Sequence, residues 1–99
     1  MLPKYSLIEL NESSLTSFSG DIEKNHTILK LSDNLNISQD KISLFLKLTS
    51  SFKENGMSFV VIQSGIDIDN FPEELNIVPT LQEAEDILEM EAIERDLGF

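Results

Sequence analysis

Four consecutive apolar residues, Phe59-Val60-Val61-Ile62, constrain the fold more than any other stretch of this sequence. Successive side chains of a strand point to opposite faces, so a strand made of these residues is apolar on both faces. Strands of this kind are typical of parallel sheets that are covered on both sides. Residues 57–63 are therefore expected to form a central strand, directly after a helix that ends at Asn55-Gly56.

The rest of the chain alternates between strand and helix patterns. β-Forming residues predict three further strands, at 4–11, 27–32 and 75–78. Apolar residues at helical spacing predict three main helices: a short one over 15–22, one after the N-cap Ser38, and one after the N-cap Thr80. The expected order is strand, helix, strand, helix, strand, loop, strand, helix. This alternation predicts a single α/β domain over 1–99 with about four mostly parallel strands.

The helix after Ser38 has the clearest apolar face of the three. It begins with Gln39 and Asp40, and an acid in the first turn suits the helix dipole. Its buried face is expected to consist of Ile42, Phe45, Leu46, Thr49 and Phe52.

The last helix has clear signals at both ends. Thr80 and Glu83 have the spacing of a capping box, and Gly98 is expected to end the helix. One apolar stripe is expected to pack on the sheet, and it consists of Leu81, Ala84, Ile87, Leu88 and Ala92.

A second apolar stripe of the last helix points in another direction. It consists of Met90, Ile93 and Leu97. At 100° per residue, this stripe lies about 120–180° from Leu81, so one straight helix on one sheet cannot bury both stripes. Methionine and aromatic residues ringed by acids have the composition of an interface. Together with Phe99, the second stripe is expected to contact another chain; the alternative is that this end folds back into the core.

The charge of the chain is one-sided. Residues 1–66 carry seven acids and six lysines, whereas 67–99 carry eleven acids and a single basic residue, Arg95. An acidic surface repels phosphate backbones, so binding of nucleic acid is not expected. Such a surface favours a basic protein partner, or it keeps the domain soluble.

Cysteine and histidine, which many catalytic and metal sites need, are scarce in this chain. It contains no cysteine and a single histidine, His26, which has no acid at catalytic spacing. One loop is acidic, at Asp67, Asp69, Glu73 and Glu74. Phe71 at the third ligand position and the lack of a following glycine exclude an EF-hand there. We therefore expect no catalytic residues, no metal and no cofactor.

Two segments resemble motifs of the STAS domain, the family named for sulfate transporters and anti-sigma factor antagonists. The first begins at 28–32 (ILKLS), runs through Ile42 and continues to the strand residues 60–62 (VVI). The second is 75–84 (LNIVPTLQEA), which leads into the last helix. In the family, a strand ending in Asp-Leu-Ser precedes Asp-Ser-Ser-Gly-Leu, and Thr-Leu-Glu-Glu-Ala opens the last helix. The resemblance implies a small STAS-like fold and a role that depends on binding a partner protein.

The chain departs from the family at the switch motif. In the alignment, Ser38 lies at the Asp position, and Gln39 and Asp40 lie at the two serine positions. The resemblance implies that the second serine, the phosphorylated switch of the family, is replaced by Asp40. At a helix N-terminus Asp40 imitates a permanently phosphorylated state, or it is only a first-turn acid, and we favour the latter. Family members also have an extra early strand and a further helix, so this chain is similar to a shortened, divergent member.

The end of the sequence, 90–99 (MEAIERDLGF), is also similar to small Bacteroidetes proteins that are associated with, or labelled as, ribonuclease Z. That nuclease needs a dinuclear metal site with several histidines, and this chain has only His26. The label therefore does not describe the chemistry of this chain.

These observations predict a non-enzymatic protein-interaction domain that resembles an anti-sigma factor antagonist. An accessory subunit of an enzyme such as ribonuclease Z, or a structural homodimer, are the alternatives. No apolar run approaches the roughly 20 residues that span a bilayer, and the sequence begins without a secretory signal pattern. We expect a cytoplasmic protein with a basic protein partner, no membrane and no nucleic acid.

Overall fold

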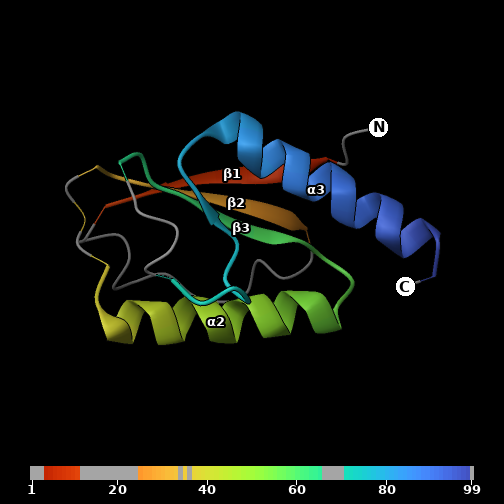
Figure 1. The fold of residues 1–99 in the computed structure, drawn as a ribbon, viewed down its shortest axis with the longest axis horizontal. Coiled ribbons are helices and arrows are strands. Elements are labelled where there is room, and N and C mark those ends of the chain that lie inside the picture. Colours follow the sequence, from red (N-terminus) through yellow and green to blue (C-terminus); the bar gives the residue numbers. More distant parts are fainter. Residues whose placement is uncertain (1–3, 12–24, 34, 36, 66–70, 99) are drawn as a thin grey trace.

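Four parallel strands form one sheet in a computed structural model that describes residues 4–11, 25–33, 35, 37–65 and 71–98 (Figure 1). The strand order is β1-β2-β3-β4, and each neighbouring pair is parallel. The described elements are β1 Tyr5–Leu10, β2 His26–Leu31, α2 Gln39–Glu54, β3 Phe59–Ile62, β4 Ile77–Val78 and α3 Leu81–Asp96.

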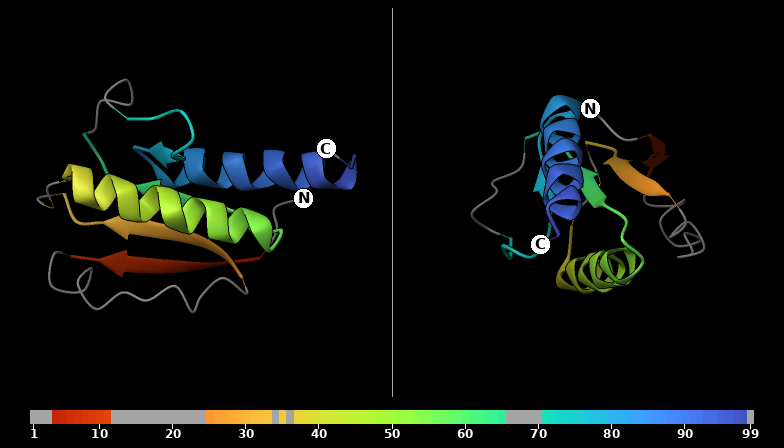
Figure 2. Two further views of the ribbon diagram at one scale, coloured as in Figure 1. Left: turned by 90° about the horizontal axis from the view of Figure 1, so that it is seen from below. Right: turned by 90° about the vertical axis from the view of Figure 1, so that its right-hand side faces the viewer.

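The two described helices lie on opposite faces of the sheet. Figure 2 shows α2 on one side of the strands and α3 on the other. The predicted α/β class and the parallel sheet are therefore confirmed. The third expected helix, over 15–22, lies outside the described residues.

The strand β3 lies between β2 and β4, as its sequence predicts. All four of its residues are buried. Phe59 and Val61 belong to the core under α2, whereas Val60 and Ile62 belong to the core under α3. The alternation of a strand thus supplies an apolar side chain to each helix in turn.

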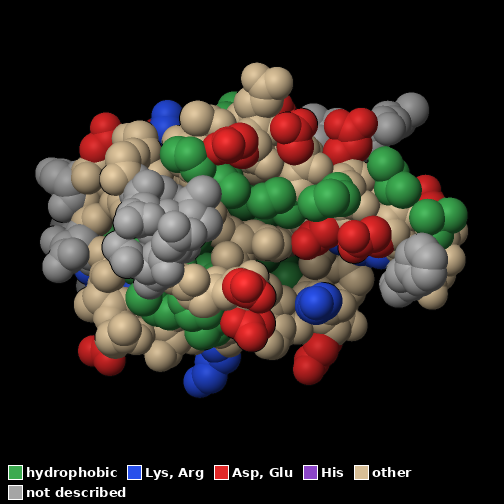
Figure 3. Space-filling model, in the orientation of Figure 1, with side chains coloured by type: hydrophobic (Ala, Val, Ile, Leu, Met, Phe, Trp, Pro, Cys, Tyr) green, Lys and Arg blue, Asp and Glu red, His purple; other side chains and the backbone are tan. Residues whose placement is uncertain are grey.

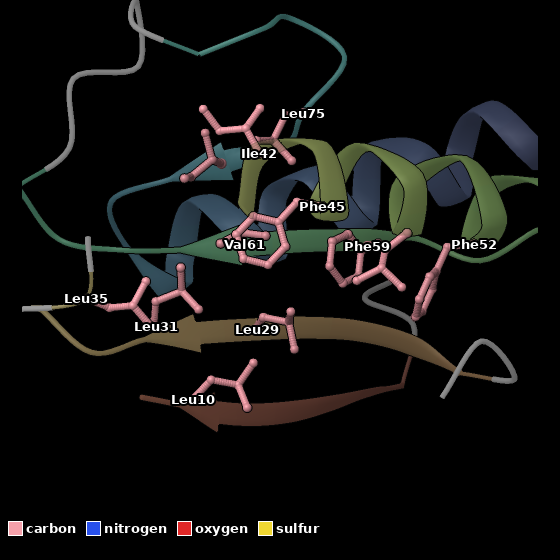
Figure 4. Packing of buried hydrophobic residues seen from close by; sticks show 12 residues of the cluster. Leu10, Leu29, Leu31, Leu35, Ile42, Phe45, Phe52, Phe59, Val61 and Leu75 are labelled. Carbon is pink, nitrogen blue, oxygen red and sulfur yellow. The ribbon is translucent and has the colours of Figure 1, made fainter. Parts of the chain in front are cut away.

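The larger core lies between α2 and the sheet (Figure 4). The rings of Phe45 and Phe52 pack around Phe59, with centroid distances of 6.5 Å and 4.9 Å. The predicted face of α2 needs one correction: Leu48 is buried, whereas Leu46 and Thr49 are only half-buried. Leu48 lies three residues after Phe45 and four before Phe52, so it shares their side of the helix.

Most expected boundaries agree with the structure to within one or two residues. Ser38 and Thr80 are the N-caps of α2 and α3. Gly56 and Gly98 follow the two helices with positive φ angles of 71° and 81°, a conformation that glycine adopts without steric cost. Two strands are shorter than predicted: β3 spans Phe59–Ile62 and not 57–63, and β4 pairs over 77–78 and not over the whole of 75–78.

The sheet side of α3 is less apolar than expected. Ala84 and Leu88 are fully buried, and Ile87 is half-buried. The prediction for Leu81 is wrong, because this residue is 39% exposed. Leu81 begins the helix and borders a hollow that Leu7, Lys30 and Ile62 also line, so its side chain stays accessible to water.

Candidate functional site

Three large apolar side chains lie exposed along one side of α3, and we call them the outward stripe. Met90 is 55% exposed, Ile93 is 53% exposed and Leu97, the C-cap, is 65% exposed. Their spacing of three and four residues places them on one side of a helix. Phe99, predicted to belong to the same contact, lies outside the described residues.

The inward side of α3 changes from apolar to charged residues along the helix, which leaves the apolar residues of the second half on the outward side. After Ala84 and Leu88, the next residues on the inward side are Glu91 and Arg95. A helix of 16 residues is about 24 Å long, whereas β3, with four residues, is about 13 Å long. The C-terminal half of α3 therefore extends beyond the amino ends of the strands, as Figure 1 shows. Beyond the sheet, polar side chains anchor the helix.

Five polar residues make this anchor, which we call the amino-edge cluster: His26, Ser58, Asn76, Glu91 and Arg95. The backbone N–H of Ser58 donates to His26 Nδ1 at 3.0 Å. The guanidinium of Arg95 donates to Ser58 Oγ and lies 3.8 Å from a carboxylate oxygen of Glu91. The amide of Asn76 donates to the other oxygen of Glu91 at 3.1 Å. The cluster thus connects β2, the start of β3 and the segment before β4 to α3.

His26 is a neutral member of the amino-edge cluster. Because Ser58 N–H donates to Nδ1, the ring carries its proton on Nε2. Burial lowers the pKa of His26 below its ordinary value, the charge of Arg95 lowers it further, and Glu91 partly opposes both effects.

This cluster was missed in the sequence analysis, because the strand predicted at 27–32 left His26 outside. The structure places His26 inside β2, on the same face as Ile28, beneath α3. One signal was available in the sequence: Arg95 is the single basic residue of 67–99. A lone cation in such an acidic segment is a candidate for a specific contact.

The outer surface of the C-terminal half of α3 is acidic. Glu94 and Asp96 are exposed beside the outward stripe, and Glu89 is half-buried. Arg95 is turned inward, to Ser58. Figure 3 shows hydrophobic side chains in a band along α3 with acidic side chains on both sides of it. The exposed surface is therefore apolar in the middle and negative at the margin.

A hollow of about 330 Å³ lies between this part of α3 and α2. Met57 and Phe59 contribute apolar surface to it, and Glu73, Glu74 and Glu94 contribute carboxylates. The carboxylates at the margin of the outward stripe thus continue toward α2, where the basic side chains of Lys53 and Arg95 also line the hollow.

The residues aligned with the family switch lie elsewhere. Ser38, Gln39 and Asp40 are exposed at the N-terminus of α2. Ser38 Oγ accepts a hydrogen bond from the backbone N–H of Lys41 at 3.5 Å, which is the contact expected of an N-cap. This end of α2 lies near the carboxyl ends of the strands, whereas the outward stripe lies beyond their amino ends (Figure 1). The structure does not bring the two predicted sites together.

The described residues form neither a metal cluster nor a membrane-spanning helix. Among them, no group of three or more His, Cys, Asp or Glu side chains is placed to hold a metal ion. No helix in the described ranges is long and apolar enough to cross a membrane.

Comparisons with protein-family models, with curated proteins and with solved structures give no match to this chain. The similarity to the STAS domain and to the proteins labelled ribonuclease Z therefore stays a prediction from the quoted motifs.

Proposed function

We propose that this chain is a non-enzymatic protein-interaction domain, and that it binds its partner through the outward stripe of α3. The exposure of the stripe supports this proposal most directly, since Met90, Ile93 and Leu97 are each more than half exposed. A large apolar side chain that stays in water forgoes roughly 1.5–3 kcal/mol relative to full burial. A partner that covers the stripe recovers part of this free energy.

The helix does not need the stripe to fold. Ala84 and Leu88 hold its first half on the sheet, and the phenol of Tyr5 donates to Glu85 at 2.7 Å. Glu91 and Arg95 hold its second half through the amino-edge cluster. The apolar residues on the opposite side are thus free to serve a second chain.

The charges around the stripe favour a partner with an apolar patch and basic residues at its margin. Glu94 and Asp96 are exposed on this side of α3, and the only basic residue of the segment points inward. Complementary charge steers association and excludes wrong partners. The same charges disfavour a second copy of this chain, because a symmetric contact through the stripe would bring the carboxylates of both copies together.

The resemblance to anti-sigma factor antagonists fits a partner-binding role of this kind. We infer that the role is not switched by a serine kinase at the family position, since Asp40 has no hydroxyl to modify. Ser38, the nearest hydroxyl upstream, serves as the helix cap.

The proposal is tested with the double substitution Ile93→Glu and Leu97→Glu in the full chain. The wild-type chain, immobilised as bait, is expected to retain a partner that the double variant loses, with the thermal midpoint of the variant nearly unchanged. Ser43→Glu with Ser50→Glu is the matched control, because it adds the same charge to exposed positions of α2. Equal retention by both variants, or a collapse of stability in the stripe variant, would refute the proposal.

A further inference from the structure

The amino-edge cluster contains the only histidine of the chain. The residue that donates a hydrogen bond to this ring also contacts α3. Ser58 N–H donates to His26 Nδ1, and Ser58 Oγ accepts from Arg95. The side chain of Arg95 projects from the half of α3 that carries the outward stripe. The protonation state of one ring is thus connected, through one residue, to the proposed interaction surface.

We propose that protonation of His26 loosens the C-terminal half of α3, residues 89–97, from the sheet and thereby makes partner binding through the outward stripe dependent on pH. The link to partner binding rests on the proposed function, whereas the loosening of α3 does not.

The chemical reason is a reversal of hydrogen-bonding roles. The neutral ring accepts the Ser58 N–H at Nδ1. When Nδ1 takes up a proton, both ring nitrogens are donors, so two N–H groups point at each other. Ser58 is only 1% exposed, so its N–H cannot turn to water without a movement of the chain. A buried donor without an acceptor destabilises the arrangement that contains it.

The second reason is electrostatic. Protonation adds a positive charge near Arg95, whose guanidinium donates to Ser58. The two cations repel each other, and Glu91, which already pairs with Arg95, offsets only part of this repulsion. Because Ser58 lies between the two cations, the hydrogen bond from Arg95 to Ser58 becomes weaker.

The other elements around the ring do not replace the lost contact. Tyr5 lies opposite His26 in β1, but its hydroxyl donates to Glu85. α2 contributes Lys53 to the neighbouring hollow, and the segment before β4 contributes Glu73 and Glu74. These groups flank Arg95 in that hollow, and no hydrogen bond joins them to His26 within the described part of the chain.

The direction of the effect follows from the lowered pKa of His26. The contact is complete above the ordinary histidine pKa of about 6.5 and is lost as the pH falls through the lower pKa of the folded state. Carboxylates titrate mostly near pH 4. A pH series from 7.5 down to the pH at which the imidazole signals show a protonated ring therefore assigns the response to the histidine.

The test is amide hydrogen exchange of the isolated full chain, corrected for the intrinsic pH dependence of exchange. Protection of the amides of Ser58 and of 91–97 is expected to fall about tenfold on protonation, the factor that corresponds to one hydrogen bond. Because the chain has a single histidine, the imidazole proton signals report its titration without overlap. The pH midpoint of the loss of protection is expected to coincide with the midpoint of the histidine titration.

His26→Asn is the matched control, because its side-chain oxygen can accept the Ser58 N–H and does not titrate in this range. Protection in this variant is expected to be independent of pH. Constant protection in the wild type, non-coincident midpoints, or an equal pH response in the variant would overturn the proposal. If α3 responds to pH but the stripe variant retains every partner, the pH response stands and the proposed function fails.

Discussion

Ser58 connects three parts of the chain that are far apart in sequence. Its carbonyl oxygen accepts from the N–H of Thr27 at 2.9 Å, its N–H donates to His26, and its hydroxyl accepts from Arg95. The residue itself is 1% exposed, and its bonds to His26 and Arg95 are partly buried. A small polar residue at the start of a buried strand thus fixes the position of a helix that begins more than twenty residues later.

Removal of this hydroxyl provides the first prediction. Ser58→Ala is expected to lower the free energy of unfolding by about 1–2 kcal/mol, because a hydrogen bond to a charged group is lost and Arg95 is partly accessible to water. Urea unfolding measures the loss. Ser50→Ala, at an exposed position of α2, is expected to change it by less than about 0.5 kcal/mol. Equal values for the two variants would contradict the role assigned to Ser58.

The cap of α2 provides a second prediction. Ser38→Ala removes the acceptor of the Lys41 N–H and is expected to cost about 1 kcal/mol. Thermal unfolding measures this loss of stability. Ser43→Ala is the control, since Ser43 is exposed on the same helix and is not the cap. Stoichiometric phosphate on Ser38 in cells, detected by mass spectrometry, would contradict the assignment of this side chain to the cap.

At the scale of the element, one side of α3 holds the helix on the sheet, and we assign the other side to a partner. The inward side is apolar over the sheet and polar beyond it, and the outward side carries the apolar stripe. An amphipathic helix normally gathers its apolar residues on one side. Because the apolar residues of α3 are divided between two opposite sides, the sheet covers only one of them, and we assign the outward stripe to a partner.

Two alanine substitutions in α3 separate these sides. Leu88→Ala is expected to lower the free energy of unfolding by about 2–5 kcal/mol, because Leu88 is fully buried under the helix. Leu97→Ala is expected to lower it by less than about 0.5 kcal/mol, because Leu97 is 65% exposed. Chemical denaturation measures both. A large loss for Leu97→Ala would show that the stripe belongs to the core.

The ends of both helices were predictable because capping is local. Ser38 with Lys41, Thr80 with Glu83, and Gly98 at the C-terminus act over a few residues, which a sequence displays directly. The central strand was predictable because its four residues are apolar on both faces. The outward position of the stripe also followed from helical spacing alone.

The amino-edge cluster was not predictable in the same way. His26 and Ser58 are 32 residues apart, and Ser58 and Arg95 are 37 apart. Only the register of β2 against β3, together with the length by which α3 exceeds the sheet, brings these side chains into contact. The sequence shows that these residue types are present. It does not show the strand register and the relative length of α3, which together place the side chains in contact.

At the scale of the whole molecule, the negative charge is concentrated in the last third of the chain. The last third of the chain carries eleven acids and one arginine, and α3, which contains most of them, extends beyond the sheet (Figure 1). A one-sided field of this kind accelerates and orients association with a basic surface.

The salt dependence of partner binding follows from this charge distribution. Exposed charges are screened over about 8 Å at physiological ionic strength and over about 3 Å at 1 M. The affinity for the partner is therefore expected to fall between low and high salt, mainly through a slower association rate. Surface plasmon resonance at several salt concentrations measures both rates. An affinity independent of salt would show that the acidic end serves solubility alone.

The central claim is that a partner covers the outward stripe, and NMR of the isotopically labelled chain with the retained partner tests it most directly. The account predicts that the amide signals of Met90, Ile93 and Leu97 shift or broaden on binding. The signals near Leu7 and Leu81, two exposed apolar residues that border a different hollow, are expected to stay in place. Changes that gather around Leu7 and Leu81, with the signals of the outward stripe unaffected, would contradict the account.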